Sequence, residues 1–194
     1  MERISLHRVM TLTAAAVLAV APLAAVAQAT ASDDDKKFVE AALKGGMSEV
    51  DLGQMAAKSG KSDDVKQFGQ MMVDDHTKLG DKMKTVAGNI GVNPPAVESA
   101  GGLATKAKLE VLTGDAFDKA YISAMVKDHE EDLADFKKEA MHGTSPEVKS
   151  AARQGAMVVQ RHLTAIRKIA AAHNVSASLQ KPSPSVLASA VAGR

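Results

Sequence analysis

Hydrophobic residues recur at intervals of three and four along four segments of the chain, and turn or capping residues bound each segment. This spacing places apolar side chains on one face of an α-helix, whereas a half-buried strand would alternate them at every second residue. The pattern predicts four helices, which run from about Asp33 to Ser59, from Ser62 to Gly91, from about Asp115 to Gly143 and from Ser145 to Asn174.

Start and stop signals support these boundaries. Ser62 and Ser145 are good N-cap residues, and Pro146 follows the second of them at the first helical position. Gly91 and Gly143 follow the second and third segments, where glycine commonly ends a helix. The fold class expected from four amphipathic helices in a chain of 194 residues is all-α, a four-helix bundle.

A long connection, residues 92–114, separates the second helix from the third. It contains Pro94-Pro95 and Gly101-Gly102, which interrupt regular structure, and a short apolar piece at residues 103–112 with room for a turn or two of helix.

The composition agrees with a helical protein and limits its chemistry. Hydrophobic residues make up 45% of the chain, but only 3% are aromatic and none is tryptophan, which favours helix over strand. The chain has no cysteine, so disulfides, thiolate metal sites, iron–sulfur clusters and cysteine nucleophiles are excluded. Any metal must be bound by His, Asp, Glu or Met.

The first 29 residues have the organisation of a signal peptide. A basic start is followed by an uncharged stretch rich in Ala, Val and Leu, and residues 25–27 and 27–29 both fit an Ala-x-Ala cleavage site. A retained membrane helix is the alternative, but Pro22 interrupts the apolar stretch and acidic residues 33–35 follow it in place of a basic stop-transfer cluster. We therefore expect a cleaved leader (1–29), a helical domain (30–175) and a periplasmic or secreted location.

The remaining sequence indicates few partners. Residues 176–194 are rich in Ser, Ala and Pro without periodicity and are expected to form a flexible tail. Removing Glu2, Arg3 and Arg8 with the leader reduces 24 basic and 23 acidic residues to 22 of each. A neutral chain with few aromatic residues does not favour nucleic-acid binding, and no transmembrane helix is expected after cleavage. The sequence identifies neither a protein partner nor an oligomeric state.

Each predicted helix has one side chain able to bind a metal on or beside its apolar face. They are Glu49, His76, His129 and His162. In the first hairpin the glutamate lies 11 or 12 residues before the turn and the histidine about 15 after it; in the second, the histidines lie 15 before and 18 after. At about 1.5 Å per residue, the mismatch in each hairpin is roughly one helical turn or less. The four side chains can share one layer of the bundle.

Two explanations account for such a buried polar layer. The first is a metal site of three imidazoles and a carboxylate, with Asp75 and Asp128 as further ligands or as acceptors that orient the rings. Its ion would be a divalent transition metal such as iron, zinc, copper or manganese. The second is a hydrogen-bond network, with Tyr121 included, that only specifies core packing in a structural or protein-interaction module. No hydrolase or nucleotide-binding motif occurs, so an enzyme is not the favoured interpretation, and oxygen-activating chemistry ranks third.

A short internal echo accompanies this layer. Residues 72–76 (Met-Val-Asp-Asp-His) recur as residues 125–129 (Met-Val-Lys-Asp-His). The echo suggests that two helical hairpins descend from one.

Several stretches resemble exported bacterial proteins that carry the domain of unknown function 4142, a group usually placed with the ferritin-like helical bundles. They are residues 38–42, 45–50, 65–76, 117–121, 125–129 and 162–163, within a resemblance that covers Lys36 to His173. The resemblance implies a ferritin-like four-helix fold, in which the long connection crosses the bundle, and an exported location. It implies no activity.

The ferritin di-iron chemistry does not carry over to this chain. Ferritin-like di-iron sites use Glu-x-x-His on two helices. The residue three before each candidate histidine is Val73, Val126 or Val159. The expected site is therefore a single metal bound by more histidine than carboxylate.

Overall fold

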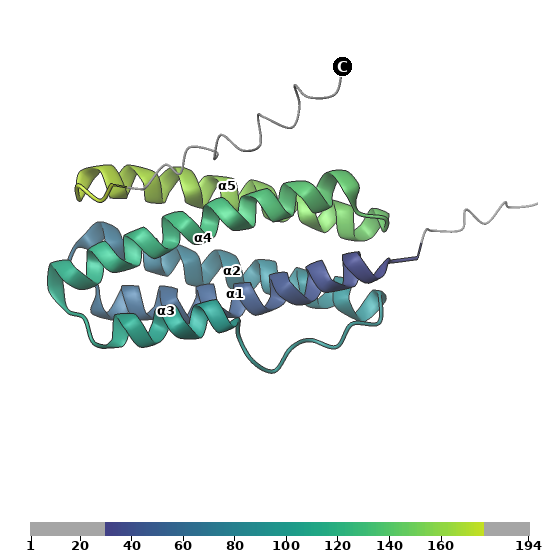
Figure 1. The fold of residues 1–194 in the computed structure, drawn as a ribbon, viewed down its shortest axis with the longest axis horizontal. Coiled ribbons are helices and arrows are strands. Elements are labelled where there is room, and N and C mark those ends of the chain that lie inside the picture. The colour runs from purple at the N-terminus through teal and green to yellow at the C-terminus, as the bar shows by residue number, and fades with distance from the viewer. Residues whose placement is uncertain (1–29, 177–194) are drawn as a thin grey trace, which may run out of the picture.

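The computed structural model describes residues 30–176, and over that range it consists of five α-helices and no strands (Figure 1). The helices are α1 (Asp33–Ser59), α2 (Asp63–Asn89), α3 (Ala100–Glu110), α4 (Gly114–His142) and α5 (Pro146–Ala172). The all-α class is confirmed. The predicted leader (1–29) and all but the first residue of the predicted tail lie outside the described residues.

The predicted count of four helices is not confirmed, because the long connection contains the fifth helix, α3. This helix has 11 residues, more than the turn or two that the apolar piece suggested. Ser99 caps it: the Ser99 hydroxyl accepts a hydrogen bond from the backbone N–H of Gly102 at 2.9 Å. The two glycines at its start did not prevent a helix because the cap and packing against α1 compensate for their low helix propensity.

α3 runs along α1 in the same direction and returns the chain to the end of the bundle where α2 begins (Figure 1). Ser99 contacts Ser48, midway along α1, and Lys106 forms an ion pair with Asp51 one turn further on. α2 and α4 therefore start at the same end and run parallel. The four long helices form two antiparallel hairpins, α1/α2 and α4/α5, packed against each other.

Equivalent positions in the two hairpins lie 83 residues apart. α1 ends at Ser59 and α4 at His142, while α2 spans Asp63–Asn89 and α5 spans Pro146–Ala172. The residues that follow the second helix of each hairpin also correspond, since Gly91 and Asn174 both have positive φ. The Asp-His echo has a different spacing, 53 residues, and relates α2 to α4. It is therefore not the repeat that relates the hairpins.

Two buried aspartates join the hairpins reciprocally. Asp35, in the first turn of α1, accepts hydrogen bonds from the backbone N–H groups of Thr144 and Ser145 at 2.9 and 3.1 Å, in the turn between α4 and α5. Asp118, near the start of α4, accepts from the N–H groups of Lys61 and Ser62, both at 2.9 Å, in the turn between α1 and α2. Each hairpin thus anchors the turn of the other, which sets their relative position along the bundle axis.

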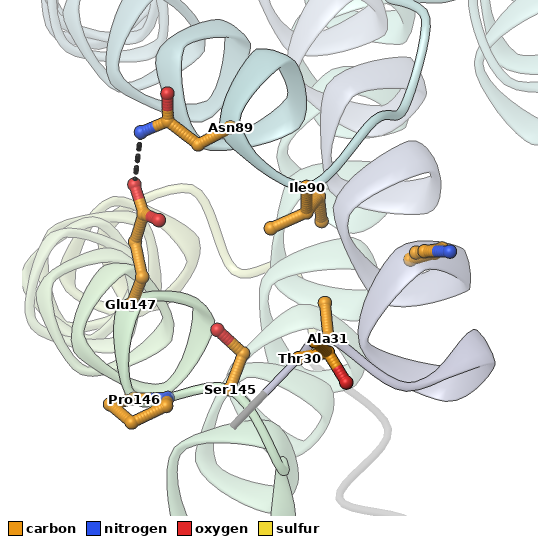
Figure 2. A pocket seen from close by; sticks show the side chains of 8 residues that line it. Thr30, Ala31, Asn89, Ile90, Ser145, Pro146 and Glu147 are labelled. Atoms are coloured by element: carbon orange, nitrogen blue, oxygen red, sulfur yellow. Dashed lines mark hydrogen bonds between the residues drawn. The ribbon is translucent and has the colours of Figure 1, made fainter. Parts of the chain in front are cut away.

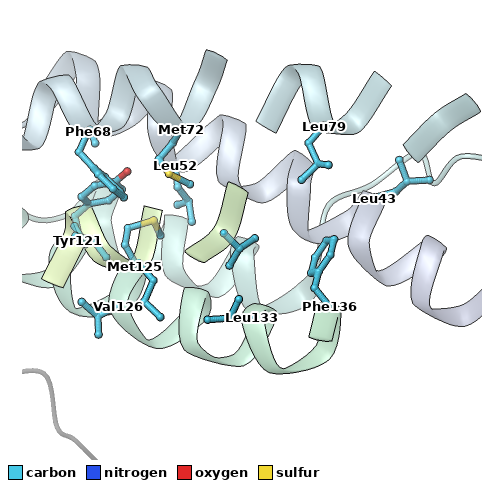
Figure 3. Packing of buried hydrophobic residues seen from close by; sticks show 14 of the residues in the cluster. Leu43, Leu52, Phe68, Met72, Leu79, Tyr121, Met125, Val126, Leu133 and Phe136 are labelled. Carbon is cyan, nitrogen blue, oxygen red and sulfur yellow. The ribbon is translucent and has the colours of Figure 1, made fainter. Parts of the chain in front are cut away.

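The core lies along the middle of the bundle, where apolar side chains from all four long helices meet (Figure 3). Phe68 of α2 packs edge-on against Tyr121 of α4, with ring centroids 6.3 Å apart. α1 and α2 approach most closely at two glycines: a Cβ atom on Gly69 would lie 2.6 Å from the carbonyl oxygen of Gly53. This contact allows only hydrogen at residue 69.

Gly69→Ala is expected to lower the free energy of unfolding by about 2 kcal/mol, because the added methyl group meets backbone atoms of α1 and forces the hairpin apart. Gly88→Ala on the same helix, where a Cβ meets nothing within 4 Å, is the control and should raise stability by about 0.5 kcal/mol. Urea denaturation measures both. Equal effects of the two substitutions would contradict the close approach.

A shared proton links Asp35 to Glu139, which is half-buried near the end of α4. Burial, followed by a hydrogen bond to Asp35 and the charge of Asp35, raises the pKa of Glu139 to about 7. Burial opposes ionisation of Asp35, but hydrogen bonds from Glu139, Ser32 and Thr144 outweigh it and lower the pKa of Asp35 to about 2. At neutral pH the pair carries one proton, on Glu139.

The free energy of unfolding should therefore fall as pH rises from about 4.5 to about 7, since the unfolded chain releases the Glu139 proton at a lower pH than the folded chain. Glu139→Gln should remove this decline and be more stable than the wild type above pH 7 by about 1 kcal/mol, a value discounted for partial exposure. Denaturant titrations across pH measure the effect, and Glu131→Gln, an exposed position on the same helix, is the control. Parallel pH profiles for wild type and Glu139→Gln would rule out the shared proton.

Candidate metal centre

Three histidines from three helices converge in the core: His76 of α2, His129 of α4 and His162 of α5. One ring nitrogen from each lies within 4.8 Å of the others. The ring centroids are 6.0 Å apart for His76 and His129, 5.2 Å for His76 and His162, and 5.5 Å for His129 and His162. The side chains are 4, 0 and 0% exposed, respectively. We call these residues the histidine triad.

His129 is oriented by its own helix. Its Nδ1 lies 2.8 Å from the carbonyl oxygen of Met125, one turn earlier on α4. A carbonyl oxygen only accepts, so Nδ1 carries the proton and Nε2 has a free lone pair. That Nε2 atom is buried and has no hydrogen-bond partner among the described residues.

His162 is oriented by a carboxylate on the neighbouring helix. Its Nε2 lies 3.0 Å from Oδ2 of Asp75, which also accepts from Arg161 at 2.8 Å. Nε2 therefore donates, and the lone pair is on Nδ1, which is buried and without a partner in the described structure. A carboxylate that orients the second nitrogen of an imidazole is a common partner of histidines that bind metals.

His76 differs from the other two, because neither of its ring nitrogens has a hydrogen-bond partner within residues 30–176. Burial, followed by the charges of His162 and His129, lowers the pKa of His76 to about 3. Burial, with His162, likewise lowers the pKa of His129 to about 4. It also lowers the pKa of His162 despite the opposing effect of Asp75. At neutral pH the rings are uncharged, the form in which imidazole binds a metal.

An aromatic side chain closes one side of the triad. The Phe68 ring centroid lies 6.3 Å from that of His129 and 6.4 Å from that of His162, both edge-on. Tyr121 lies beyond Phe68, and its hydroxyl is buried without a hydrogen-bond partner in the described part of the chain. Burial, and then the charge of Glu49, raise the pKa of Tyr121 far above its usual value. Tyr121 therefore contributes no hydrogen bond to the triad.

Glu49 of α1 lies beside the triad. It is 4% exposed, and its Oε1 is 3.9 Å from Nδ1 of His129, the nitrogen already bonded to Met125. Its other oxygen has no partner among the described residues. Burial, and then the charges of Asp132 and Asp128, raise the pKa of Glu49 well above its usual range. The carboxylate thus approaches the His129 edge that faces away from the free lone pair.

The two predicted aspartates have different surroundings. Asp75 contacts His162 directly, as an orienting acceptor would. Asp128 is half-buried on α4 and forms no hydrogen bond or ion pair in the described structure; burial raises the pKa of its carboxyl group. It belongs with Glu49 and Asp132 to an acidic group on the α1/α4 side of the core.

Asp132 was missed by the sequence reasoning. Burial, and then the charge of Asp128, raise the pKa of Asp132 to about 7. Asp132 occupies the position in α4 that corresponds to Glu49 in α1, 83 residues later. The spacing between the hairpins would have identified it, but the Asp-His echo pointed to a different alignment.

The cavity in Figure 2 lies apart from the triad. It occupies about 390 Å³ at the end of the bundle where α1 and α5 begin and α2 ends. Asn89 donates a hydrogen bond to Glu147 at 2.6 Å across it, and Ile90, Ser145 and Thr30 line it. No residue of the triad lines this cavity.

Comparisons with known proteins identify a family and a shared fold. The sequence model of the family described as "Domain of unknown function (DUF4142)" matches residues 20–169. No curated protein matches the chain significantly. Among the described helices, none is long and apolar enough to cross a membrane.

Two solved structures have a similar fold. A DUF305 fragment from Deinococcus radiodurans has a TM-score of 0.64 and 17% identity, covering 72% of this chain and 97% of that chain. A DUF305 protein from Streptomyces coelicolor, described provisionally as secreted, has a TM-score of 0.61 and 14% identity, covering 72% of this chain and 93% of that chain. At these identities the similarity establishes the fold alone.

The hydrogen bonds determine the tautomers expected in metal-free protein. His129 should carry its proton on Nδ1 and His162 on Nε2, because Met125 and Asp75 accept from those atoms. Nitrogen-15 NMR of the side chains at pH 7 distinguishes the two forms. Replacing Asp75 with Leu should change the His162 spectrum and leave that of His129 unaltered, whereas the same tautomer for both rings would contradict the assignment.

Proposed function

We propose that this chain, which belongs to the family described as domain of unknown function DUF4142, binds one divalent transition-metal ion through His76, His129 and His162. One observation carries the proposal: the ring nitrogens left over after all other hydrogen bonds are made, on three separate helices, lie within bonding range of a common point. A buried polar atom without a partner is unfavourable by about 1–3 kcal/mol, and a bound cation would provide the missing partner for all three.

A buried network that only specifies packing would require the same atoms to pair with one another. Among residues 30–176, no hydrogen bond joins the three histidines to each other, to Glu49 or to Tyr121. Native cores rarely leave several such atoms unpaired. The purely structural alternative is therefore the weaker interpretation.

The donor set suits a particular class of ion. Neutral imidazoles favour zinc, copper, iron and nickel, whereas manganese prefers carboxylate and water. Three histidines leave a fourth position, for which Glu49 is the nearest buried carboxylate. Asp75 would orient His162, and Asp128 would stay outside the ligand set. We assign no reaction to the site, and metal storage or sensing is the role that a binding site alone supports.

The fold and the location are part of the proposal. One connection that runs along the bundle and makes α2 parallel to α4 is typical of ferritin-like folds, and we place the helical domain, residues 30–175, in that class. We also propose export to the periplasm or the medium. The signal-peptide pattern of residues 1–29 supports export, as does the secreted description of one structural neighbour.

Metal analysis of the mature chain, residues 30–194, purified without a histidine tag, should find one metal ion per chain. His129→Ala should lose it, because a ligand in the middle of the triad is removed. Added zinc should raise the thermal midpoint of the wild type but not of the variant, since a ligand that binds only the native state stabilises it by mass action. His142→Ala, an exposed histidine at the end of α4, is the control and should retain the ion.

Two results would argue against the proposal. One is a wild-type protein that contains no metal and is not stabilised by zinc, copper, iron or manganese. The other is an equal loss of stability in His129→Ala with and without metal, which would indicate a packing role for the ring.

A further inference from the structure

A second cavity, of about 260 Å³, lies between α1, α2 and the long connection, and His76 lines it. α1 contributes Gly46 and Met47, α2 contributes Gly80, and the connection contributes Pro94 and Pro95. Its walls are mostly apolar, and it opens to solvent between the two helices. Of the three histidines, only His76 lines this cavity.

His76 is also the one member of the triad without an anchor. Met125 orients His129, and Asp75 orients His162, so turning either ring breaks a hydrogen bond. Turning His76 breaks none among the described residues, and the adjacent cavity provides space for the ring. The second nitrogen of a metal-binding histidine usually donates to a carboxylate, a carbonyl or water. For His76, water in the cavity is the partner that remains.

We infer that this cavity is the port through which the metal ion enters and leaves the histidine triad, with His76 as the ligand that moves. The inference rests on the proposed metal binding. At about 30 Å³ of liquid volume per water molecule, the cavity has room for roughly eight waters, enough for an ion that still holds part of its hydration shell. On another side, Phe68 packs against His129 and His162 and blocks approach.

Two glycines allow the port to be closed from opposite walls. A Cβ atom on Gly46 or on Gly80 would meet nothing within 4 Å, so larger side chains fit there without displacing the helices. Both residues lie within helices, where leucine is also more favourable than glycine. Gly46→Leu and Gly80→Leu are therefore expected to fold and to fill the cavity.

The test is stopped-flow kinetics with zinc(II) alone as the added ion and a chromogenic chelator to remove it. Each leucine variant should take up and release zinc at least tenfold more slowly than the wild type. Because both rates fall together, the equilibrium Kd should stay within threefold. Gly45→Leu is the matched control: it is adjacent on α1, its Cβ also meets nothing within 4 Å, and it does not line the cavity.

The outcomes separate the two proposals. Zinc exchange as fast in both port variants as in Gly45→Leu would overturn the port, while stoichiometric zinc in the wild type would leave the metal site standing. Weakened affinity without slower release would also overturn the port, because a blocked passage changes rates and not the bound state. A wild type that binds no zinc, copper or iron would overturn both.

Discussion

Burial of imidazole nitrogens that have no hydrogen-bond partner is the constraint on which this structure depends. Folding removes the triad from water, yet Met125 and Asp75 satisfy only one nitrogen each on His129 and His162, and none on His76. Each such atom is unfavourable by about 1–3 kcal/mol in the metal-free protein, so the apolar core must offset this cost. With a metal bound, the same atoms would contribute directly to folding stability.

The meeting of the three rings depends on contacts far from them. His76 belongs to one hairpin, and His129 and His162 belong to the other, so a slide of one hairpin by a single turn, about 5.4 Å, would separate them. Asp35 and Asp118 prevent such a slide, since each binds the turn of the opposite hairpin through two backbone N–H groups. These aspartates, at opposite ends of the bundle, therefore position the site at its centre.

Helical periodicity was sufficient to predict the four long helices, and the distances of the histidines from the turns placed them near one level. Periodicity alone could not predict α3, because a segment with two glycines and a weak apolar face becomes helical only through its cap and its contact with α1. It also could not separate Asp75 from Asp128, since a residue beside the apolar stripe can face the core or the solvent. Asp132 required the relation between the hairpins, which only the folded structure revealed.

Electrostatics explains why the fourth long helix provides a carboxylate instead of another histidine. A divalent ion among three neutral imidazoles would bring two positive charges into a medium of low dielectric constant, at a large desolvation cost unless negative charge is nearby. Asp75 provides one negative charge through His162, although Arg161 shares it. Glu49, buried and 3.9 Å from His129, can provide the second. A buried carboxylate without a partner and a buried cation without a counter-charge are both unfavourable, and each reduces the cost of the other. Under this assignment every long helix contributes to one charge-balanced site, and Glu49 has a role whether or not it binds the ion directly.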